Sequence, residues 1–288
     1  QFAQGYGTTS VGADFGAFGQ LTAGKQYDAF YAVQEPLDIY EDVGSIMQGD
    51  TNGDRRTGTF AYTYDNYGFF APVSYETAAD DALVRGEKVD VEGGFAGSLG
   101  YTFDNVLFGP LSFKVGYSYV KGQDDKATAL YEPNKAFDNF RQSGASITWG
   151  SLDSGLYLAA LYQKNITKRF KVSVDDFTTA DYKETDHGYQ FIVGYAFDNG
   201  LGAYVGYDVK YHNEKNSQFL IDGAVFPSLK TGKYTLRRVP VFVNYTFNPN
   251  FYVWSELEFD ANSSRDAHTD ADNLETGTMF SVGARYIF

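Results

Sequence analysis

The feature that most constrains this chain of 288 residues is a hydrophobic pattern that repeats every two residues. In residues 201–211 the odd positions are Leu201, Ala203, Val205, Tyr207, Val209 and Tyr211, and the even positions carry Gly, Tyr, Asp and Lys. Similar alternation recurs in residues 111–119, 239–247 and 251–259. Because successive side chains of a strand point to opposite faces, each segment predicts a β-strand with one apolar face.

About thirteen segments have this strand-like character. They cover residues 5–15, 17–26, 55–64, 67–77, 89–103, 107–121, 138–150, 154–164, 182–197, 200–212, 233–247, 250–263 and 276–288. Short connections rich in Asn, Asp, Gly or Pro alternate with long polar ones such as 78–88, 166–181 and 213–232. We therefore expect turns at one end and long loops at the other, as in outer-membrane β-barrels.

The alternation alone also fits a soluble sandwich, in which the apolar faces would meet inside. Two observations favour a membrane barrel with the apolar faces outside. Phe103, Phe197 and Phe247 stand beside the turns, where lipid-interface aromatic residues gather. The segments are also longer than the ~5–6 residues typical of soluble strands. We predict that residues such as Val205, Val241 and Val253 face lipid.

The composition excludes several other classes of protein. The chain has no cysteine, which excludes a disulfide scaffold and a thiol enzyme, and its net charge of −14 argues against nucleic-acid binding. His187, His212 and His268 stand without a nucleophile elbow or a zinc motif. Residues 50–54 resemble half an EF-hand, but its twelfth position would be Ala61. We predict no enzymatic activity, no catalytic residue, no cofactor and no metal site.

One long segment, residues 35–58, interrupts the strand pattern. It reads EPLDIYEDVGSIMQGDTNGDRRTG, is acidic, and ends beside the basic pair Arg55 and Arg56. A long acidic loop next to a basic wall does not suit a hydrophobic core that excludes water. It suits the narrow point of a water-filled barrel, so we predict that this loop lies inside the pore.

Three blocks of sequence carry a family resemblance. They are GKQYDAFY at 24–31, LDIYEDVGS at 37–45 and RTGTFAYTYDNYGFF at 56–70, and the chain ends in YIF. The chain thus resembles the trimeric general porins of Gram-negative outer membranes. The resemblance implies an all-β transmembrane antiparallel β-barrel, with 16 strands in the intact protein, a constriction loop folded into the lumen, and one domain over residues 1–288.

The resemblance also implies the residues of the pore constriction. Asp38 and Asp42 match the two loop carboxylates, with Glu41 beside them. Arg56 and Lys25 match basic residues of the opposite wall. The remaining two, Tyr27 and Tyr31, match tyrosines near the start of the loop.

The strand count departs from the family. About thirteen strands are predicted instead of 16, and the resemblance begins at what looks like the family's fourth strand, so roughly 70 residues of its amino end lack a counterpart. An open sheet would leave unpaired edges in lipid. We expect either that the sequence is incomplete at the amino end or that the barrel has 14 strands.

The function implied is passive diffusion of ions and small hydrophilic solutes through a homotrimer in the outer membrane of a Gram-negative bacterium, in contact with lipopolysaccharide and lipid. Inward acids at 208, 256 and 258 suggest a modest cation preference, opposed by bases at 114, 210, 238 and 285. An oligosaccharide-selective channel is the alternative, and its candidate aromatic lining is Trp149, Trp254, Tyr204 and Tyr252. If Arg56 faces the lumen, simple alternation places Thr57, Thr59, Ala61 and Thr63 outside, as a small-residue contact between barrels.

Overall fold

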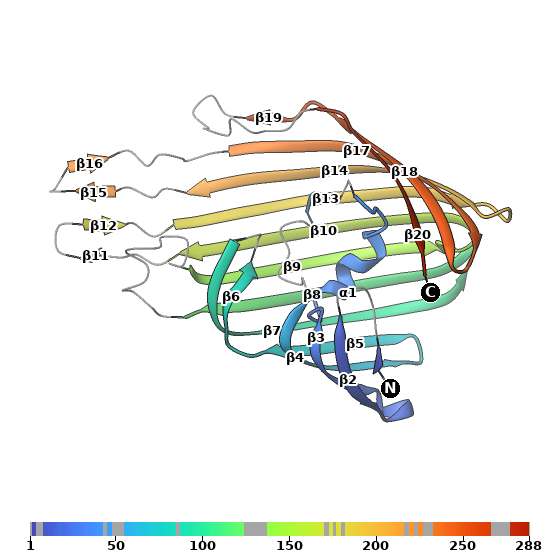
Figure 1. Cartoon of the computed structure of the whole chain (residues 1–288), viewed down its shortest axis with the longest axis horizontal. Helices are drawn as coiled ribbons and strands as arrows, with labels where there is room; N and C mark the ends of the chain where they lie inside the picture. The colour runs from blue at the N-terminus through green and yellow to red at the C-terminus, as the bar shows by residue number, and fades with distance from the viewer. Residues whose placement is uncertain are drawn as a thin grey trace.

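The computed structural model describes residues 2–3, 8–42, 45–47, 55–84, 87–123, 137–169, 173–174, 177–179, 182–215, 219–221, 224–226, 233–265 and 277–287. Most of them form one large, curved antiparallel sheet (Figure 1). Its strands are β1 (Phe2–Ala3), β2 (Thr9–Asp14), β3 (Gln20–Gln26), β4 (Arg56–Asn66), β5 (Phe69–Glu76), β6 (Ala79–Val84), β7 (Glu87–Val106), β8 (Gly109–Gly122), β9 (Phe137–Gly150), β10 (Gly155–Arg169), β13 (Tyr182–Ala196), β14 (Leu201–Lys215), β17 (Lys233–Asn248), β18 (Phe251–Asp260), β19 (Ser264–Arg265) and β20 (Met279–Tyr286).

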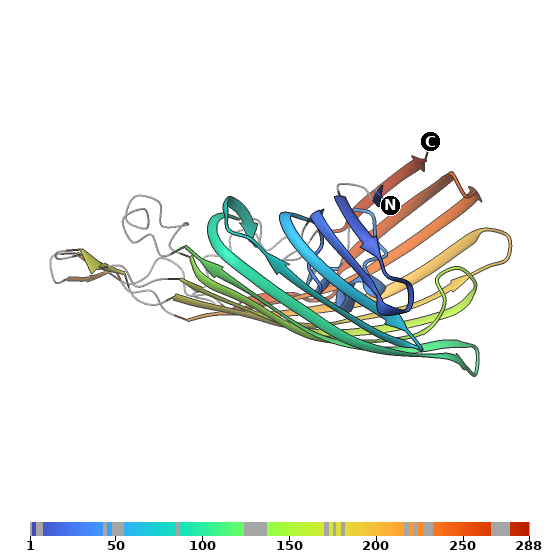
Figure 2. The ribbon, with the colours of Figure 1, turned by 90° about the horizontal axis from the view of Figure 1, so that it is seen from below.

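Neighbours in the sequence are neighbours in this sheet. The order is β1-β2-β3-β4-β5-β7-β8-β9-β10-β13-β14-β17-β18-β20, with β6 paired to β7 and β19 paired to β17. Figure 2 shows the sheet as a deep trough, with both chain ends on its open side. Among the described strands, β1 and β20 stand at the two ends of the order, and no backbone pairing joins them. The described strands therefore do not close the ring.

All thirteen predicted strands are present, and the predicted long loops hold further strands. A second sheet has the order β11-β12-β15-β16, formed by β11 (Ser173–Val174), β12 (Phe177–Thr179), β15 (Phe219–Ile221) and β16 (Ala224–Phe226). It lies beyond the ends of β10, β13, β14 and β17 (Figure 1). The predicted loop 78–88 is largely a hairpin, because β6 folds back on β7.

The apolar faces of the strands lie outside, as predicted. Val205 is 45% exposed and Phe247 is 58% exposed, whereas Asp208 and Glu256 are buried on the inner face. Soluble proteins rarely expose so large a contiguous apolar surface. Among the described residues, no helix is long and apolar enough to span a membrane.

One predicted orientation is wrong, and a bulge in β4 explains it. Gly24 pairs with Thr59 and Gln26 pairs with Arg56, so β4 holds one extra residue opposite β3. Gly58 takes φ +75° at this point, a conformation that favours glycine. Thr59 is consequently fully buried and Phe60 is half exposed. Beyond the bulge the inner face of β4 carries Thr59, Ala61 and Thr63, and its outer face carries aromatic residues, so the small-residue outer contact is not formed.

The strands predicted at 55–64 and 67–77 leave residues 65–66 between them as a turn, but the turn lies two residues further along the chain. Residues 65–66 belong to β4, and the connection to β5 is Tyr67-Gly68. Both residues have positive φ, 54° and 78°, as a two-residue hairpin turn that follows the sheet twist requires. The Asn66 side chain accepts the Tyr67 N–H at 2.9 Å and supports this turn.

Candidate functional site

The segment between β3 and β4 crosses the inner face of the trough and contains two short helices, α1 (Tyr31–Gln34) and η2 (Glu35–Leu37). Asp28 fixes its entry: one carboxylate oxygen accepts the N–H groups of Phe30 and Tyr31, and the other accepts the Ser118 hydroxyl at 2.9 Å. These bonds satisfy backbone donors that a helix start leaves free. Burial nevertheless raises the pKa of Asp28, since desolvation outweighs these bonds.

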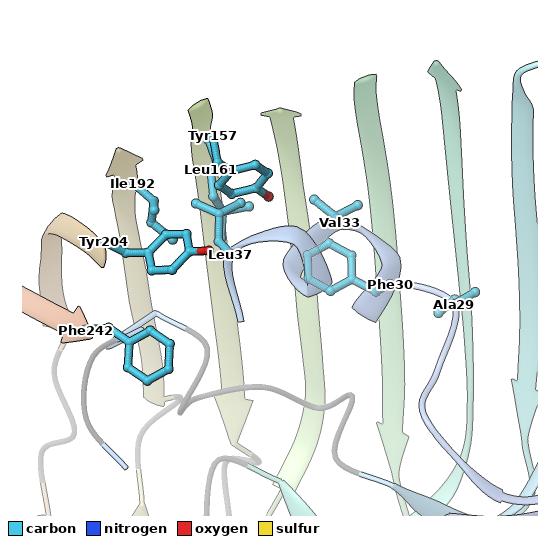
Figure 3. Close-up of a cluster of buried hydrophobic side chains, with 11 residues drawn as sticks. Ala29, Phe30, Val33, Leu37, Tyr157, Leu161, Ile192, Tyr204 and Phe242 are labelled. Carbon is cyan, nitrogen blue, oxygen red and sulfur yellow. The ribbon is translucent and has the colours of Figure 1, made fainter. Parts of the chain in front are cut away.

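The underside of this loop is apolar and packs on the wall. Phe30, Val33 and Leu37 are fully buried. They belong to one cluster with wall residues of β10, β13, β14 and β17, namely Tyr157, Leu161, Ile192, Tyr204 and Phe242 (Figure 3). The loop therefore turns an apolar face toward the inner wall of the trough.

Buried amides complete the attachment to the wall. Gln34 Nε2 donates to Gln163 Oε1 at 2.7 Å, and Gln190 Nε2 donates to the Ser45 hydroxyl oxygen at 2.9 Å. All four residues, three glutamines and one serine, are at least nine-tenths buried. Because an unmade hydrogen bond of a buried amide is costly, these contacts select one position of the loop.

The far end of the loop is attached to the last strands, β18 and β20. The buried Glu256 carboxylate accepts the backbone N–H groups of Glu41 and Asp42. The Glu41 side chain contacts the Tyr252 hydroxyl and the Arg285 guanidinium. The Asp42 side chain accepts the Ser281 hydroxyl. A carboxylate bonded by two N–H groups forms a strong, charge-assisted attachment.

Near the start of the loop, Tyr27, Tyr31 and Asp38 form one group. The rings of Tyr27 and Tyr31 are stacked at 3.8 Å, and Arg55 lies over the Tyr27 ring at 5.4 Å. The Tyr31 hydroxyl donates to Asp38 at 2.8 Å. The surrounding loop partly desolvates Asp38, although its side chain still reaches water, and this desolvation raises the pKa of Asp38 against the opposing effects of the Tyr31 hydrogen bond and the Arg55 charge. Burial also raises the pKa of Tyr31, so this phenol stays protonated as a donor.

The predicted basic residues, Lys25 and Arg56, form a third group, at the end of β3 and the start of β4. Arg56 donates to Glu76 at 2.9 Å and to the Leu83 carbonyl at 3.0 Å. Lys25 is exposed and lines the same hollow as Arg55 and Arg56. The seven predicted site residues thus fall into three groups, and the carboxylate that contacts Arg56 is Glu76.

Sequence reasoning missed how the loop is held. Asp28 was not singled out, and Glu256 was expected to face pore water, whereas it is buried under the loop. Arg238 contacts Glu258 at 3.3 Å and Asp260 at 3.0 Å in the same layer. The sequence did show polar residues at the inner positions of the strands. This pattern identifies the inner face of the sheet, but it does not tell which of these residues contact the loop. Residues 50–54 and His268 lie outside the described residues, and within the described part no cluster suited to a metal is present.

A pocket of about 280 Å³ opens between the loop and the wall of β14, β17 and β18. Its lining residues are Asp38, Ile39, Glu41, Leu152, Tyr204, Phe242, Asn244, Thr246 and Tyr252. Of the four aromatic residues proposed for a sugar path, Tyr204 and Tyr252 line this pocket. Trp149 instead stacks on Phe108 at 4.3 Å and donates to the Val106 carbonyl at the turn end.

Comparisons with known proteins agree with the fold of the large sheet. The family model described as Gram-negative porin matches residues 3–219. The OmpF porin of Salmonella typhi, in a complex with daunomycin, superimposes with a TM-score of 0.64 at 17% identity, over 97% of this chain and 77% of that one. OmpT of Vibrio cholerae gives 0.65 at 16% identity over 98% and 80%, and its trimer form gives 0.59 at 15% over 98% and 80%. A search of the curated proteins found no match. At these identities the structural likeness is one of fold.

Proposed function

Because the chain belongs to the family of Gram-negative porins, which are non-enzymatic channels of the outer membrane, we propose that it lines a water-filled pore for passive diffusion of ions and small hydrophilic solutes. The observation that carries the proposal is the two-sided loop. Phe30, Val33 and Leu37 are buried against the inner wall, while Asp38 and Asp42 remain exposed. Such a loop narrows the pore without filling it.

The constriction is proposed to consist of Asp38, Glu41 and Asp42 on the loop, and of Lys25 and Arg56 on the wall. Tyr27 and Tyr31 support Asp38 from the start of the loop. Opposite charges across a narrow, low-dielectric passage create a transverse field. That field orders water and dipolar solutes in the passage. An apolar solute must give up the contact with this ordered water in order to pass. Pore width and the charges together set selectivity.

A modest cation preference follows from which charges remain available. Arg56 is paired with Glu76 and Arg285 with Glu41, so each pair adds little net charge, and Lys25 is the exposed base of the proposed constriction. Asp208 and Glu256 are buried and accept loop N–H groups, so they contribute less to the field in the water. Asp38 and Asp42 are the exposed loop charges of the constriction, and together they outweigh the single exposed base Lys25 and attract cations.

The assembly is proposed to be a homotrimer that contacts lipopolysaccharide and lipid. One of the OmpT structures with this fold is a trimer form, which supports the idea by analogy. On this chain, the outer faces of β3–β5 carry exposed Leu21, Phe60 and Tyr75, an apolar surface suited to lipid or to another barrel.

Planar-bilayer recording of the purified protein tests the proposal. We expect stepwise conductance in KCl, closure in three steps, and a reversal potential in a KCl gradient that favours potassium. Absence of conductance steps would contradict the channel, and a reversal potential favouring chloride would contradict the proposed constriction charges.

A further inference from the structure

The pocket between loop and wall opens on the turn side of the constriction. Leu152 belongs to the connection between β9 and β10, and Thr246 precedes the turn between β17 and β18. A solute that passes the loop toward the turn end therefore meets this pocket next to the constriction.

One wall of the pocket is a flat aromatic platform. A Cβ atom on Gly194 would lie 2.0 Å from the Tyr204 ring, and one on Gly202 would lie 2.9 Å from it. The two glycines thus let the ring lie flat against the barrel wall. The Tyr204 hydroxyl donates to the Leu152 carbonyl at 3.0 Å, which fixes the ring in its plane.

The rings of Phe242 and Tyr252 and the side chains of Ile39 and Leu152 complete the apolar lining. Phe242 lies 6.0 Å from Tyr204, centre to centre, and Figure 3 shows both rings on the wall beside the loop. Tyr252 already carries a cation on its face, because the Arg285 guanidinium lies 5.4 Å from its ring centre. Aromatic faces attract organic cations through their quadrupole.

The charged groups of the pocket lining are both carboxylates. Its described lining residues include the carboxylates of Asp38 and Glu41 and the amide of Asn244, with no lysine or arginine among them. Glu41 is neutralised by Arg285. Asp38 accepts a hydrogen bond from the Tyr31 hydroxyl and feels the charge of Arg55, which is not part of the lining, and its carboxylate lies at the mouth of the aromatic pocket.

We propose that this pocket is a transient binding site for small organic ammonium ions, of about the size of one aromatic ring, on their way through the pore. The charge of Asp38 attracts the ammonium group, and Tyr204 and Phe242 receive the apolar part. A cation of this size fits a pocket of about 280 Å³. Anions are repelled by Asp38, and neutral rings lack the ionic attraction. The inference deepens the proposed porin function and rests on it.

The binding is expected to be weak. The pocket is open to pore water, where ion pairs and cation–π contacts each contribute little. A site on a conduction path must also release its occupant for transport to continue. We expect half-saturation at roughly millimolar concentration, the range of weak association.

Single-channel recording with three probes tests the site. Benzyltrimethylammonium, benzyl alcohol and benzenesulfonate are added in turn to the turn side, and the KCl current is measured against concentration. We expect saturable block by the cation only, with a half-blocking concentration at least about fivefold below that of the other two. The cation should block more strongly from the turn side than from the loop side.

Matched variants assign the block to the pocket. Asp38→Asn and Tyr204→Leu should each raise the half-blocking concentration by about fivefold, whereas Tyr204→Phe keeps the platform and should retain the block. Asp104→Asn near the turn end of β7 and Tyr195→Leu on the outer face are the controls and should change nothing. The KCl conductance of each variant reports whether it has folded.

The outcomes separate the two proposals. A protein that conducts KCl but shows equal or unsaturable effects of the three probes overturns the binding site and leaves the channel intact. Block that survives both Asp38→Asn and Tyr204→Leu in conducting channels also overturns the site. A protein without KCl conductance overturns the proposed function, and the binding site with it.

Discussion

Replacing Leu37 by alanine tests whether the loop is held by its apolar face. Leu37 is fully buried in one cluster with Leu161 and Ile192 of the wall. Removing such a side chain typically costs about 2–5 kcal/mol, from lost burial and the cavity left behind. The undocked loop would face pore water rather than lipid, so the hydrophobic contribution applies in full. The docking equilibrium should therefore weaken by roughly 30-fold to several-thousand-fold.

The assay is the open-channel current of single Leu37→Ala channels at fixed voltage, together with the size limit for sugars in a liposome-swelling experiment. We expect added current noise and a larger size limit. Leu99→Ala is the matched control, because Leu99 is 55% exposed on the outer face, where lipid is as apolar as leucine. Noise and size limit equal to those of the unaltered protein would refute the hydrophobic attachment of the loop.

Three further predictions concern charge. Arg285→Gln should free the Glu41 carboxylate and raise the cation preference in a KCl gradient, and an unchanged reversal potential would count against this contact. Because burial raises the pKa of Asp38, its charge is present above that pKa and is lost on acidification earlier than for an ordinary aspartate. The cation preference should therefore fall as the pH is lowered, and Asp38→Asn should show a smaller fall; equal falls would contradict the role of Asp38. Arg56→Gln should cost about 3–5 kcal/mol of stability, since it leaves the buried Glu76 unpaired. The double variant with Glu76→Gln should recover most of the melting temperature, and no recovery would argue against the pair.

The strands and their inner and outer faces were predictable from the sequence, because a period of two is a local property. Val205 and Asp208 differ in parity and lie on opposite faces, as expected. The exception is β4, where one extra residue reverses the parity after Gly58. A glycine in a strand is a known signal of a bulge, but the sequence alone did not distinguish it from the many glycines of this chain.

The position of the loop inside the pore was predictable only in outline. Its acidic composition indicated that the loop lies in water, and the family resemblance indicated that it forms a constriction. The contacts that hold it join residues far apart in the chain, such as Gln34 with Gln163 and Asp42 with Glu256. Such contacts depend on the curvature of the whole sheet, which no local pattern encodes. The short strands β11, β12, β15 and β16 were also missed. They form two local pairs of only two or three residues, and the β12–β15 pairing that joins these pairs connects two separate loops.

Thiol labelling in a lipid bilayer tests the central claim, that the polar faces and the loop meet water while the apolar faces meet lipid. The chain has no cysteine, so a single introduced thiol is the only target. A charged, membrane-impermeant methanethiosulfonate is applied to Asp42→Cys and to Val205→Cys during current recording. We predict a stepwise fall in current for Asp42→Cys and no change for Val205→Cys. Reaction at position 205 with none at position 42 would contradict the account.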